Sequence, residues 1–263
     1  MLDSLYTLPD LAISAIFGTV MFIAVAFLPY LLRPLLRVTT DKDTVDFATR
    51  AQTTVIGFLA IVLSFSLVNA QLNLRNVDAL VSREAAAINQ MDRLLLRYSD
   101  PKVAEMRSLL AAYAQSIVNV DWPLLTQGNQ SELASKSSQT FGPLSRAVYS
   151  ITPLAGRQTE IYGQILKQID DLSEMRSQRI EAANIRLPDI FWNVIFALFS
   201  LLVVLAVLIE PTLGRLVAIG GQAMAVALLL SLVFIFDQPF KGQTRIGPDA
   251  IIKVIGIMKN RTS

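Results

Sequence analysis

The stretch TTVIGFLAIVLSFSLVNA, residues 53–70, runs directly into QLNLRNVDALVSREAAAINQMDRLLLRY, residues 71–98, and this junction decides the fold. The first part is apolar and uncharged, which is typical of a segment that crosses the hydrocarbon core of a bilayer. In the second part, Val77, Ile88 and Met91 belong to an apolar repeat with spacings of four and three residues, the pattern of a packed helix. We therefore predict one continuous helix that begins in the membrane and ends outside it.

Three further apolar stretches approach the roughly 20 helical residues that a bilayer requires. They are residues 11–32, 190–210 and 216–236, which together with 53–70 give four predicted spans. The composition agrees, because the 263 residues are 53% hydrophobic and 17% charged, whereas a soluble domain carries about 25% charged residues. We expect an all-α integral membrane protein whose spans form two hairpins.

Between these hairpins, residues 71–187 carry 13 basic and 12 acidic side chains, interspersed as on a solvated helical surface. We interpret this segment as an extramembrane helical bundle. The first hairpin then occupies residues 1–70 and the second 188–236. Residues 237–263 are expected to be an amphipathic tail, a loop followed by a short helix at the membrane surface.

Helix boundaries inside the bundle are marked by proline. Asp100-Pro101 and Thr152-Pro153 each place a capping residue before a proline at the first helical position, so each predicts the start of a helix. Trp122-Pro123 is expected to end the first of these helices. The polar residues 126–136 are then expected to form a loop, with room for a short helix.

The absence of cysteine and histidine removes most side-chain chemistry. Thiolate nucleophiles, disulfides, haem ligation, Ser-His triads and nearly all zinc or copper sites need one of these residues. The net charge of +2 is too small to indicate a nucleic-acid partner. We expect a protein that is not an enzyme and that uses no cofactor and no metal ion.

Small or polar residues recur along one face of the predicted second span. The positions are Thr53, Gly57, Ala60, Ser64 and, further along, Gln71. Such residues let two helices pack closely in a membrane, which is one interpretation. The other is that copies of this face surround a pore, where modest polarity lets ions pass without tight binding. The sequence leaves both open, and we take these five residues as candidate pore-lining positions.

The end of the fourth span carries the second candidate site, Asp237 with Pro239, Phe240 and Gly242. Asp-x-Pro-Phe can form a turn in which the carboxylate accepts backbone N–H groups. The alternative is a carboxylate at the membrane edge that pairs with an arginine or an ion on a transport path. Glu210-Pro211 is more simply the end of the third span.

Five short motifs lie along nearly the whole chain. They are Val55-Ile56-Gly57-Phe58, Arg83-Glu84-Ala85, Asp121-Trp122-Pro123, Ile161-Tyr162 ahead of Leu172 and Arg176, and Asp237-Gln238-Pro239-Phe240-Lys241-Gly242. Together they resemble the bacterial bestrophin-like membrane family, a domain family of undefined role. The last motif, placed directly after an apolar span, is the most specific. The resemblance implies fold and topology, and it makes Asp237, Pro239, Phe240 and Gly242 a structural or gating motif.

The family name implies kinship with bestrophins, pentameric anion channels with four transmembrane helices whose extramembrane helices continue the pore. This resemblance leads us to expect a homo-oligomer, with a pentamer as the implied stoichiometry, that passes small inorganic ions through a pore lined by the second span. Anions or weak selectivity are expected. The competing hypothesis is a non-conducting sensor or scaffold whose bundle binds a ligand or a partner protein. The chain shows no acidic cluster for calcium, so calcium gating is not implied.

The loop between the first two spans carries Arg33, Arg37, Lys42 and Arg50, whereas the N-terminal tail has no basic side chain. The positive-inside rule makes that loop cytoplasmic, so the bundle would lie outside a bacterial inner membrane. The basic residues of the C-terminal tail and the bestrophin topology favour the opposite orientation. We expect the outward orientation because the first hairpin usually dominates.

Overall fold

The structure is a computed structural model that describes residues 2–35, 41–98, 100, 102–154, 156–209 and 212–261. It divides into two compact units. The membrane unit consists of the described residues in 1–73, 186–238 and 242–244, and the bundle unit of those in 74–185, 239–241 and 245–263. Three features of the sequence interpretation, Arg37, Pro101 and Glu210-Pro211, lie outside the described residues.

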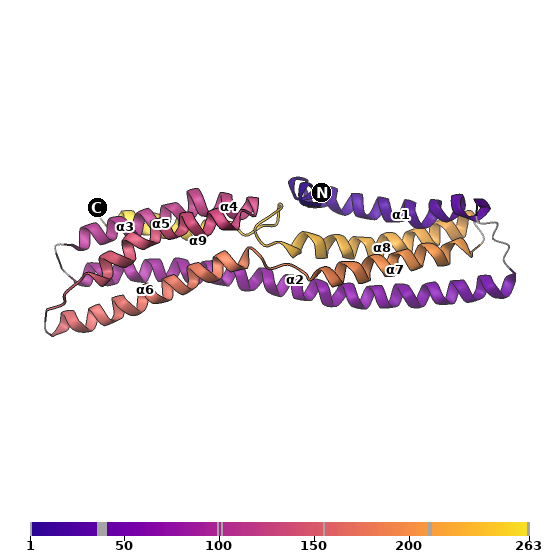
Figure 1. Cartoon of the computed structure of the whole chain (residues 1–263). Helices are drawn as coiled ribbons and strands as arrows, with labels where there is room; N and C mark the ends of the chain where they lie inside the picture. The colour runs from indigo at the N-terminus through magenta and orange to yellow at the C-terminus, as the bar shows by residue number, and fades with distance from the viewer. Residues whose placement is uncertain are drawn as a thin grey trace. The chain divides into compact units, whose positions relative to one another are not determined.

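Four helices that are long and apolar enough to cross a membrane contribute to the membrane unit. They are α1 (Asp10–Leu35), the first part of α2 (Lys42–Tyr98), α7 (Asp189–Val207) and α8 (Leu213–Asp237), with a short 3₁₀ helix, η1 (Leu2–Thr7), ahead of α1. Figure 1 shows them side by side in this unit. The four predicted spans and the all-α membrane fold are confirmed.

The membrane unit is held by apolar packing with one close helix approach. Fully buried leucines and isoleucines of α2, α7 and α8 form its centre, among them Leu59, Ile195 and Leu230. Where α1 meets α8, a Cβ added to Gly220 would lie only 2.8 Å from the Phe22 ring, so any larger residue would force that ring to move. Such small-residue contacts are a common way for membrane helices to pack.

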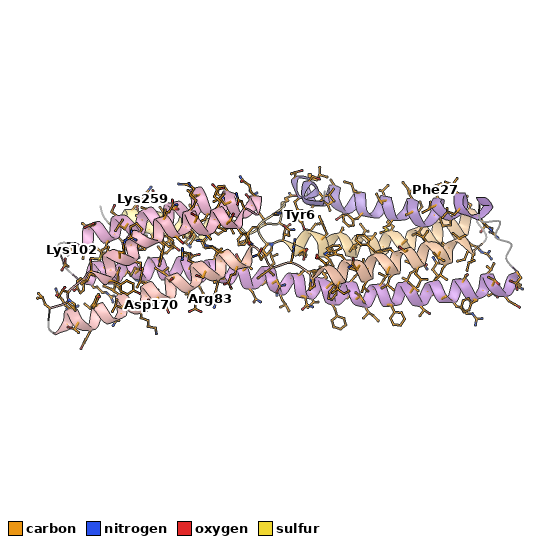
Figure 2. All side chains as sticks on the ribbon, viewed as in Figure 1. Tyr6, Phe27, Arg83, Lys102, Asp170 and Lys259 are labelled. Atoms are coloured by element: carbon orange, nitrogen blue, oxygen red, sulfur yellow. The ribbon has the colours of Figure 1, made fainter. Side chains whose placement is uncertain are left out.

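The start of the chain is fixed to the end of α8 by an aromatic contact. The ring of Tyr6, labelled in Figure 2, stacks on Phe234 with 4.5 Å between the ring centres. Its hydroxyl donates a hydrogen bond of 2.9 Å to the Phe234 carbonyl oxygen. Both ends of the Tyr6 side chain are therefore satisfied within the membrane unit.

The second half of α2 packs one face into the core of the bundle unit, as the heptad pattern predicts. The helix continues without interruption for 57 residues. The other helices of this unit are α3 (Val103–Ser116), a π-helical segment η2 (Ile117–Asp121), α4 (Trp122–Gln127), α5 (Gln130–Tyr149), α6 (Arg157–Ala182) and α9 (Asp249–Asn260). One contiguous apolar core joins all of these helices.

Two local predictions for the bundle are wrong. Trp122-Pro123 does not end a helix, because the chain passes through the π-helical turn into α4, where Pro123 occupies one of the first two positions. The expected loop 126–136 is reduced to a short link at Gly128, whose φ of 74° ends α4. Helix α5 then starts at Gln130, because a sparse buried stripe that includes Leu133 and Phe141 packs into the core despite its polar neighbours.

The expected position of the C-terminal helix is also wrong. Helix α9 packs against α3, and its apolar face, formed by Ile251, Val254 and Met258, is buried in the bundle core rather than lying on a membrane. An amphipathic stripe requires an apolar partner but does not specify which one. The end of the helix is fixed by Arg261, which donates to the buried Asp92 carboxylate at 2.9 Å.

Candidate functional site

The structure places the five candidate pore residues on α2, and the rest of the membrane unit leaves this side of the helix uncovered. Thr53, Gly57, Ser64 and Gln71 are exposed, and Ala60 is half-buried. The Ser64 hydroxyl donates to the Ala60 carbonyl oxygen at 2.6 Å, so its hydrogen-bonding demand is met within the helix. A Cβ added to Gly57 would contact nothing within 4 Å. This face is free for water or for a second copy of the chain.

Beside the small-polar face lies a second uncovered stripe of bulky apolar residues. It consists of Phe58, Ile61, Phe65, Val68 and Leu72, which are between 49% and 69% exposed. Successive residues of an α-helix are about 100° apart, so the small-polar and bulky faces of α2 are neighbours. An open hollow of about 360 Å³, lined by Ala60, Ile61, Ser64, Phe65 and Val68, lies where they meet. The bulky apolar face is suited to lipid or to an apolar partner.

The candidate motif at the end of α8 makes defined contacts in the membrane unit. Asp237 is 8% exposed, and its Oδ1 accepts the backbone N–H of Leu187 at 2.6 Å. This carboxylate therefore fixes the chain entering α7, fifty residues away, rather than its own turn. Gly242 has a φ of 83°, a conformation that glycine adopts without strain, and lies against the ring of Tyr6.

Pro239 and Phe240, the other two residues of this motif, belong to the bundle unit. Phe240 is buried and meets the Trp122 ring edge to face, with 5.8 Å between the ring centres. The Pro239 carbonyl oxygen accepts the N–H of Ile246 at 2.9 Å, while the Ile246 carbonyl accepts from Trp122 Nε1 at 3.2 Å. The motif thus makes packing and hydrogen-bond contacts in both units.

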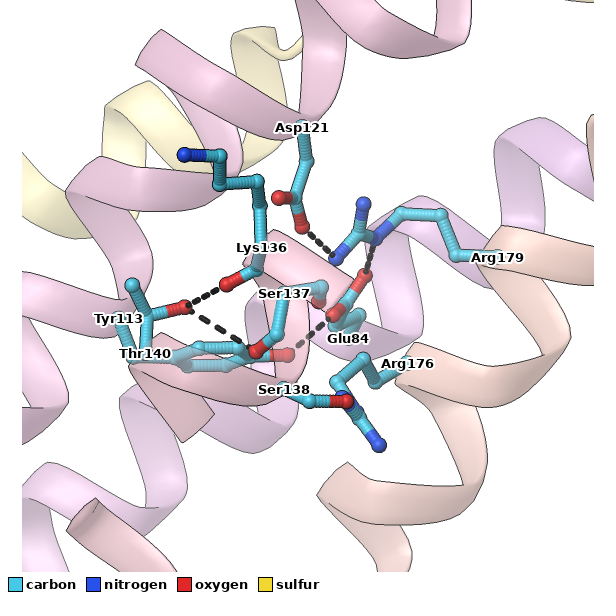
Figure 3. Close-up of polar contacts among 9 residues, drawn as sticks. All are labelled: Glu84, Tyr113, Asp121, Lys136, Ser137, Ser138, Thr140, Arg176 and Arg179. Carbon is cyan, nitrogen blue, oxygen red and sulfur yellow. Dashed lines mark hydrogen bonds and ion pairs between the residues drawn. The ribbon is translucent and has the colours of Figure 1, made fainter. Parts of the chain in front are cut away.

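The bundle core contains a buried charge cluster that sequence reasoning missed (Figure 3). Arg179 of α6 is fully buried, and its Nε donates to Glu84 Oε2 of α2 at 2.7 Å. Its Nη2 donates to Asp121 Oδ2 of the π-helical segment at 2.8 Å. The Tyr113 hydroxyl donates to the other Glu84 oxygen at 2.8 Å. Three helical segments are thus joined by one guanidinium group.

Two carboxylates, those of Glu84 and Asp121, share the one guanidinium group of Arg179. The pKa values of Asp121 and Arg179 both depart from their ordinary values. Burial raises the pKa of Asp121 above its ordinary value of 3.8, although the positive charge of Arg179 opposes that shift. Burial alone would lower the pKa of Arg179, but Glu84, Tyr113 and Asp121 together raise it. Arg179 is therefore held charged, and burial makes the Asp121 carboxylate easier to protonate than an ordinary aspartate.

The sequence did contain one signal for this cluster. Glu84 falls in the same heptad register as Val77 and Met91, where an apolar side chain is expected. A charge at a buried position needs a partner of opposite sign. Nothing in the sequence identifies Arg179 as that partner, because it lies 95 residues away and follows other basic residues on α6.

Comparison with known proteins identifies the family to which this fold belongs. The Bestrophin-like domain family matches residues 19–251. The chain belongs to the Bestrophin-like family. Two of the motifs that carry the resemblance, Arg83-Glu84-Ala85 and Asp121-Trp122-Pro123, supply the two carboxylates that bind Arg179. Two motifs that are each weakly diagnostic of the family therefore contribute to the same buried cluster in this Bestrophin-like fold.

Solved structures agree with the family assignment. A bacterial bestrophin homologue from Klebsiella pneumoniae is similar with a TM-score of 0.67 at 12% identity, over 96% of this chain and 98% of that one. A point variant of the Klebsiella homologue gives a TM-score of 0.65 at 13% identity, over 97% and 99%. At such identities the likeness shows the fold. No curated protein matches this chain.

Proposed function

We propose that this Bestrophin-like protein is a homo-oligomeric ion channel in which α2 helices of several copies line a shared pore. The observation that carries the proposal is the uncovered side of α2, where Thr53, Gly57 and Ser64 are exposed beside the bulky apolar stripe. In a ring of copies, one of these faces meets the axis and the other meets the neighbouring copy. Membership of the Bestrophin-like family supports the same assembly.

The proposed substrates are small inorganic ions, with anions or weak selectivity favoured and a pentamer as the expected ring. A face of hydroxyl and glycine groups offers an ion weak contacts and no deep binding site, which conduction requires. If the bulky stripe faces the axis instead, Ile61 and Phe65 would form an apolar constriction of the kind that closes by expelling water. We propose no catalytic activity and no cofactor.

Reconstitution in liposomes tests this function. The full chain is expected to release chloride or potassium from loaded vesicles, and images of the purified protein are expected to show a closed ring. A monomer without flux, across several anions and cations and both membrane polarities, would overturn the channel. That result would favour the competing proposal of a sensor or scaffold that binds a ligand or partner through the bundle.

The proposed location is the bacterial inner membrane with the bundle outside. Because the chain has no cysteine, Lys136→Cys on the exposed surface of α5 provides a single labelling site. A membrane-impermeant thiol reagent applied to intact cells is expected to label it. Labelling only after lysis would reverse the orientation, and the four-helix topology would remain because both chain ends lie on one side in either case.

A further inference from the structure

The exposed surface of α2 within the bundle unit is unusually basic. Between residues 75 and 97 it presents four exposed arginines, Arg75, Arg83, Arg93 and Arg97, which we call the arginine stripe. The exposed acidic residue on the same part of α2 is Asp78. None of the four arginines forms an ion pair with any residue that the structure describes. Arg83, labelled in Figure 2, donates to the Ala79 carbonyl oxygen of its own helix at 3.3 Å.

This surface contrasts with the charges elsewhere in the bundle. The remaining acidic residues of the second half of α2, Glu84 and Asp92, are buried and neutralised by arginines from other helices. Glu181 of α6 is the one carboxylate that joins Arg83 in lining a surface hollow of about 350 Å³. The arginine stripe therefore carries four positive charges against the two nearby carboxylates of Asp78 and Glu181, in a segment whose overall charge is almost balanced.

We propose that the arginine stripe lines the extramembrane part of the conduction path and selects anions there. This inference rests on the proposed channel, since it places α2 along the axis outside the membrane as well as inside it. In an oligomer, the equivalent arginines of all copies form a ring of positive charge around the axis. Such a ring raises the local anion concentration and repels cations. The small side chains of Ala79, Ser82 and Ala86, exposed among the arginines, leave room for hydrated ions.

The alternative role for the stripe is structural. Acidic residues exposed on α6, such as Asp170 and Glu174, could pair with the arginines of a neighbouring copy. In that case the arginines would hold the ring together without contacting permeating ions. The two roles differ in what a charge change does to an assembled channel, so the test must act after assembly.

Cysteine chemistry allows such a test. Arg93→Cys is introduced into the cysteine-free chain, the oligomer is purified and reconstituted, and the reversal potential is measured across a potassium chloride gradient. A methanethiosulfonate reagent that adds a sulfonate is expected to lower the chloride-to-potassium permeability ratio severalfold. The reagent that adds a trimethylammonium group is expected to keep or restore the preference for chloride. Arg146→Cys, an exposed position on α5, is the matched control and should respond to neither reagent.

The outcomes separate this inference from the channel itself. Flux whose reversal potential is unchanged by both reagents at Arg93→Cys and likewise at Arg75→Cys overturns the selecting role and leaves the channel intact. Replacing the arginines of the stripe with glutamine gives a second test. If these variants remain helical but no longer assemble into a ring, and any rings that do form keep the wild-type selectivity, the selecting role is overturned in favour of the structural role. Absence of flux from the wild-type chain overturns both proposals. Lower salt should enlarge the expected shift, because charges are screened within about 10 Å at 0.1 M.

Discussion

The membrane part and the bundle part of α2 differ in whether they carry charge and in where it lies. In the membrane unit the helix has no charged residue between 53 and 70, its buried side is mainly aliphatic, and its uncovered side carries uncharged polar, small and bulky apolar residues. In the bundle unit the buried side includes Glu84 and Asp92, and the uncovered side is the arginine stripe. A single unbroken helix thus presents an uncharged surface to one environment and a charged one to the other.

This difference shows what each environment permits. Hydrocarbon offers no solvation to a charge, so residues 53–70 carry none, and hydroxyls such as that of Ser64 bond to their own helix. The bundle half can bury a carboxylate because neighbouring helices supply a guanidinium, as Arg179 does for Glu84. Both halves leave one side of α2 uncovered, and that shared feature is what the channel proposal explains.

Replacing Arg179 is expected to have the largest effect on stability. Arg179→Met leaves Glu84 and Asp121 buried without a cation, so we expect a loss of about 3–5 kcal/mol in the free energy of unfolding. Arg176→Met, three residues earlier, is the control. Arg176 is half-buried over the Phe141 ring at 5.0 Å, and its loss should cost about 1 kcal/mol or less.

Thermal unfolding of the purified proteins in detergent measures both changes. Equal losses for the two variants would show that the cluster is not special. A triple variant, Glu84→Met, Asp121→Leu and Arg179→Met, should recover much of the stability, since an apolar core can replace a buried ion cluster. Failure of this rescue would indicate that packing around Arg179, rather than its charge, is what the single variant disrupts.

The membrane half of α2 is tested by adding volume at Ser64. If the small-polar face surrounds an aqueous path, Ser64→Trp should abolish flux from an intact oligomer, and Ser64→Asp should shift selectivity towards cations. Ser200→Trp on α7 is the matched control, because that serine is also exposed and also bonds to the carbonyl four residues before it. It should leave flux unchanged.

Other outcomes assign the two faces of α2 differently. If the small-polar face packs against a neighbouring copy, Ser64→Trp should disrupt the oligomer, because a tight interface tolerates added volume poorly. An intact ring with wild-type flux in both Ser64 variants would remove this face from the pore. Phe65→Ser should then increase flux, as expected of a constriction on the bulky face.

The parts of the fold that depend on local sequence pattern could be predicted. The four spans follow from apolar length, and the continuity of α2 follows from a heptad register that crosses from one environment to the other. The start of α5 could not be found this way, because a few buried residues such as Leu133 outweigh a polar stretch only once the core exists. The partner of α9 was missed for the same reason.

The candidate sites show the same division. The uncovered face of α2 could be identified because its residues repeat along one helix. The buried cluster could not, because Glu84, Asp121 and Arg179 come from three separate segments. The role of Asp237 could be predicted only in part. Its motif was evident, whereas its hydrogen bond to the distant Leu187 depends on tertiary contact.

Asp237 provides a smaller test in the membrane unit. Asp237→Ala removes the acceptor for the buried Leu187 N–H, which should cost about 1–3 kcal/mol of stability. Asp237→Asn keeps a side-chain oxygen in nearly the same place and should cost less. Thermal unfolding compares the two. If instead Asn is as harmful to flux as Ala while both proteins remain stable, the charge of Asp237 acts on ions and the structural interpretation is wrong.

The smallest expected effect concerns the pH dependence of the buried cluster. The pKa of Asp121 is raised in the folded protein, so between its ordinary value of 3.8 and the raised value the folded state binds more protons than the unfolded state. Stability from this group is therefore present at low pH and decreases as the pH rises through that window. Asp121→Asn cannot ionise, so it should be most favourable relative to wild type at neutral pH, and the difference should shrink as the pH falls towards 3.8. Unfolding temperatures of the two proteins over this range provide the measurement, and Asp170→Asn, an exposed position on α6, corrects for general charge effects. A difference that grows on acidification would mean that Arg179 lowers the pKa of Asp121 more than burial raises it, and the cluster would then resemble an ordinary ion pair.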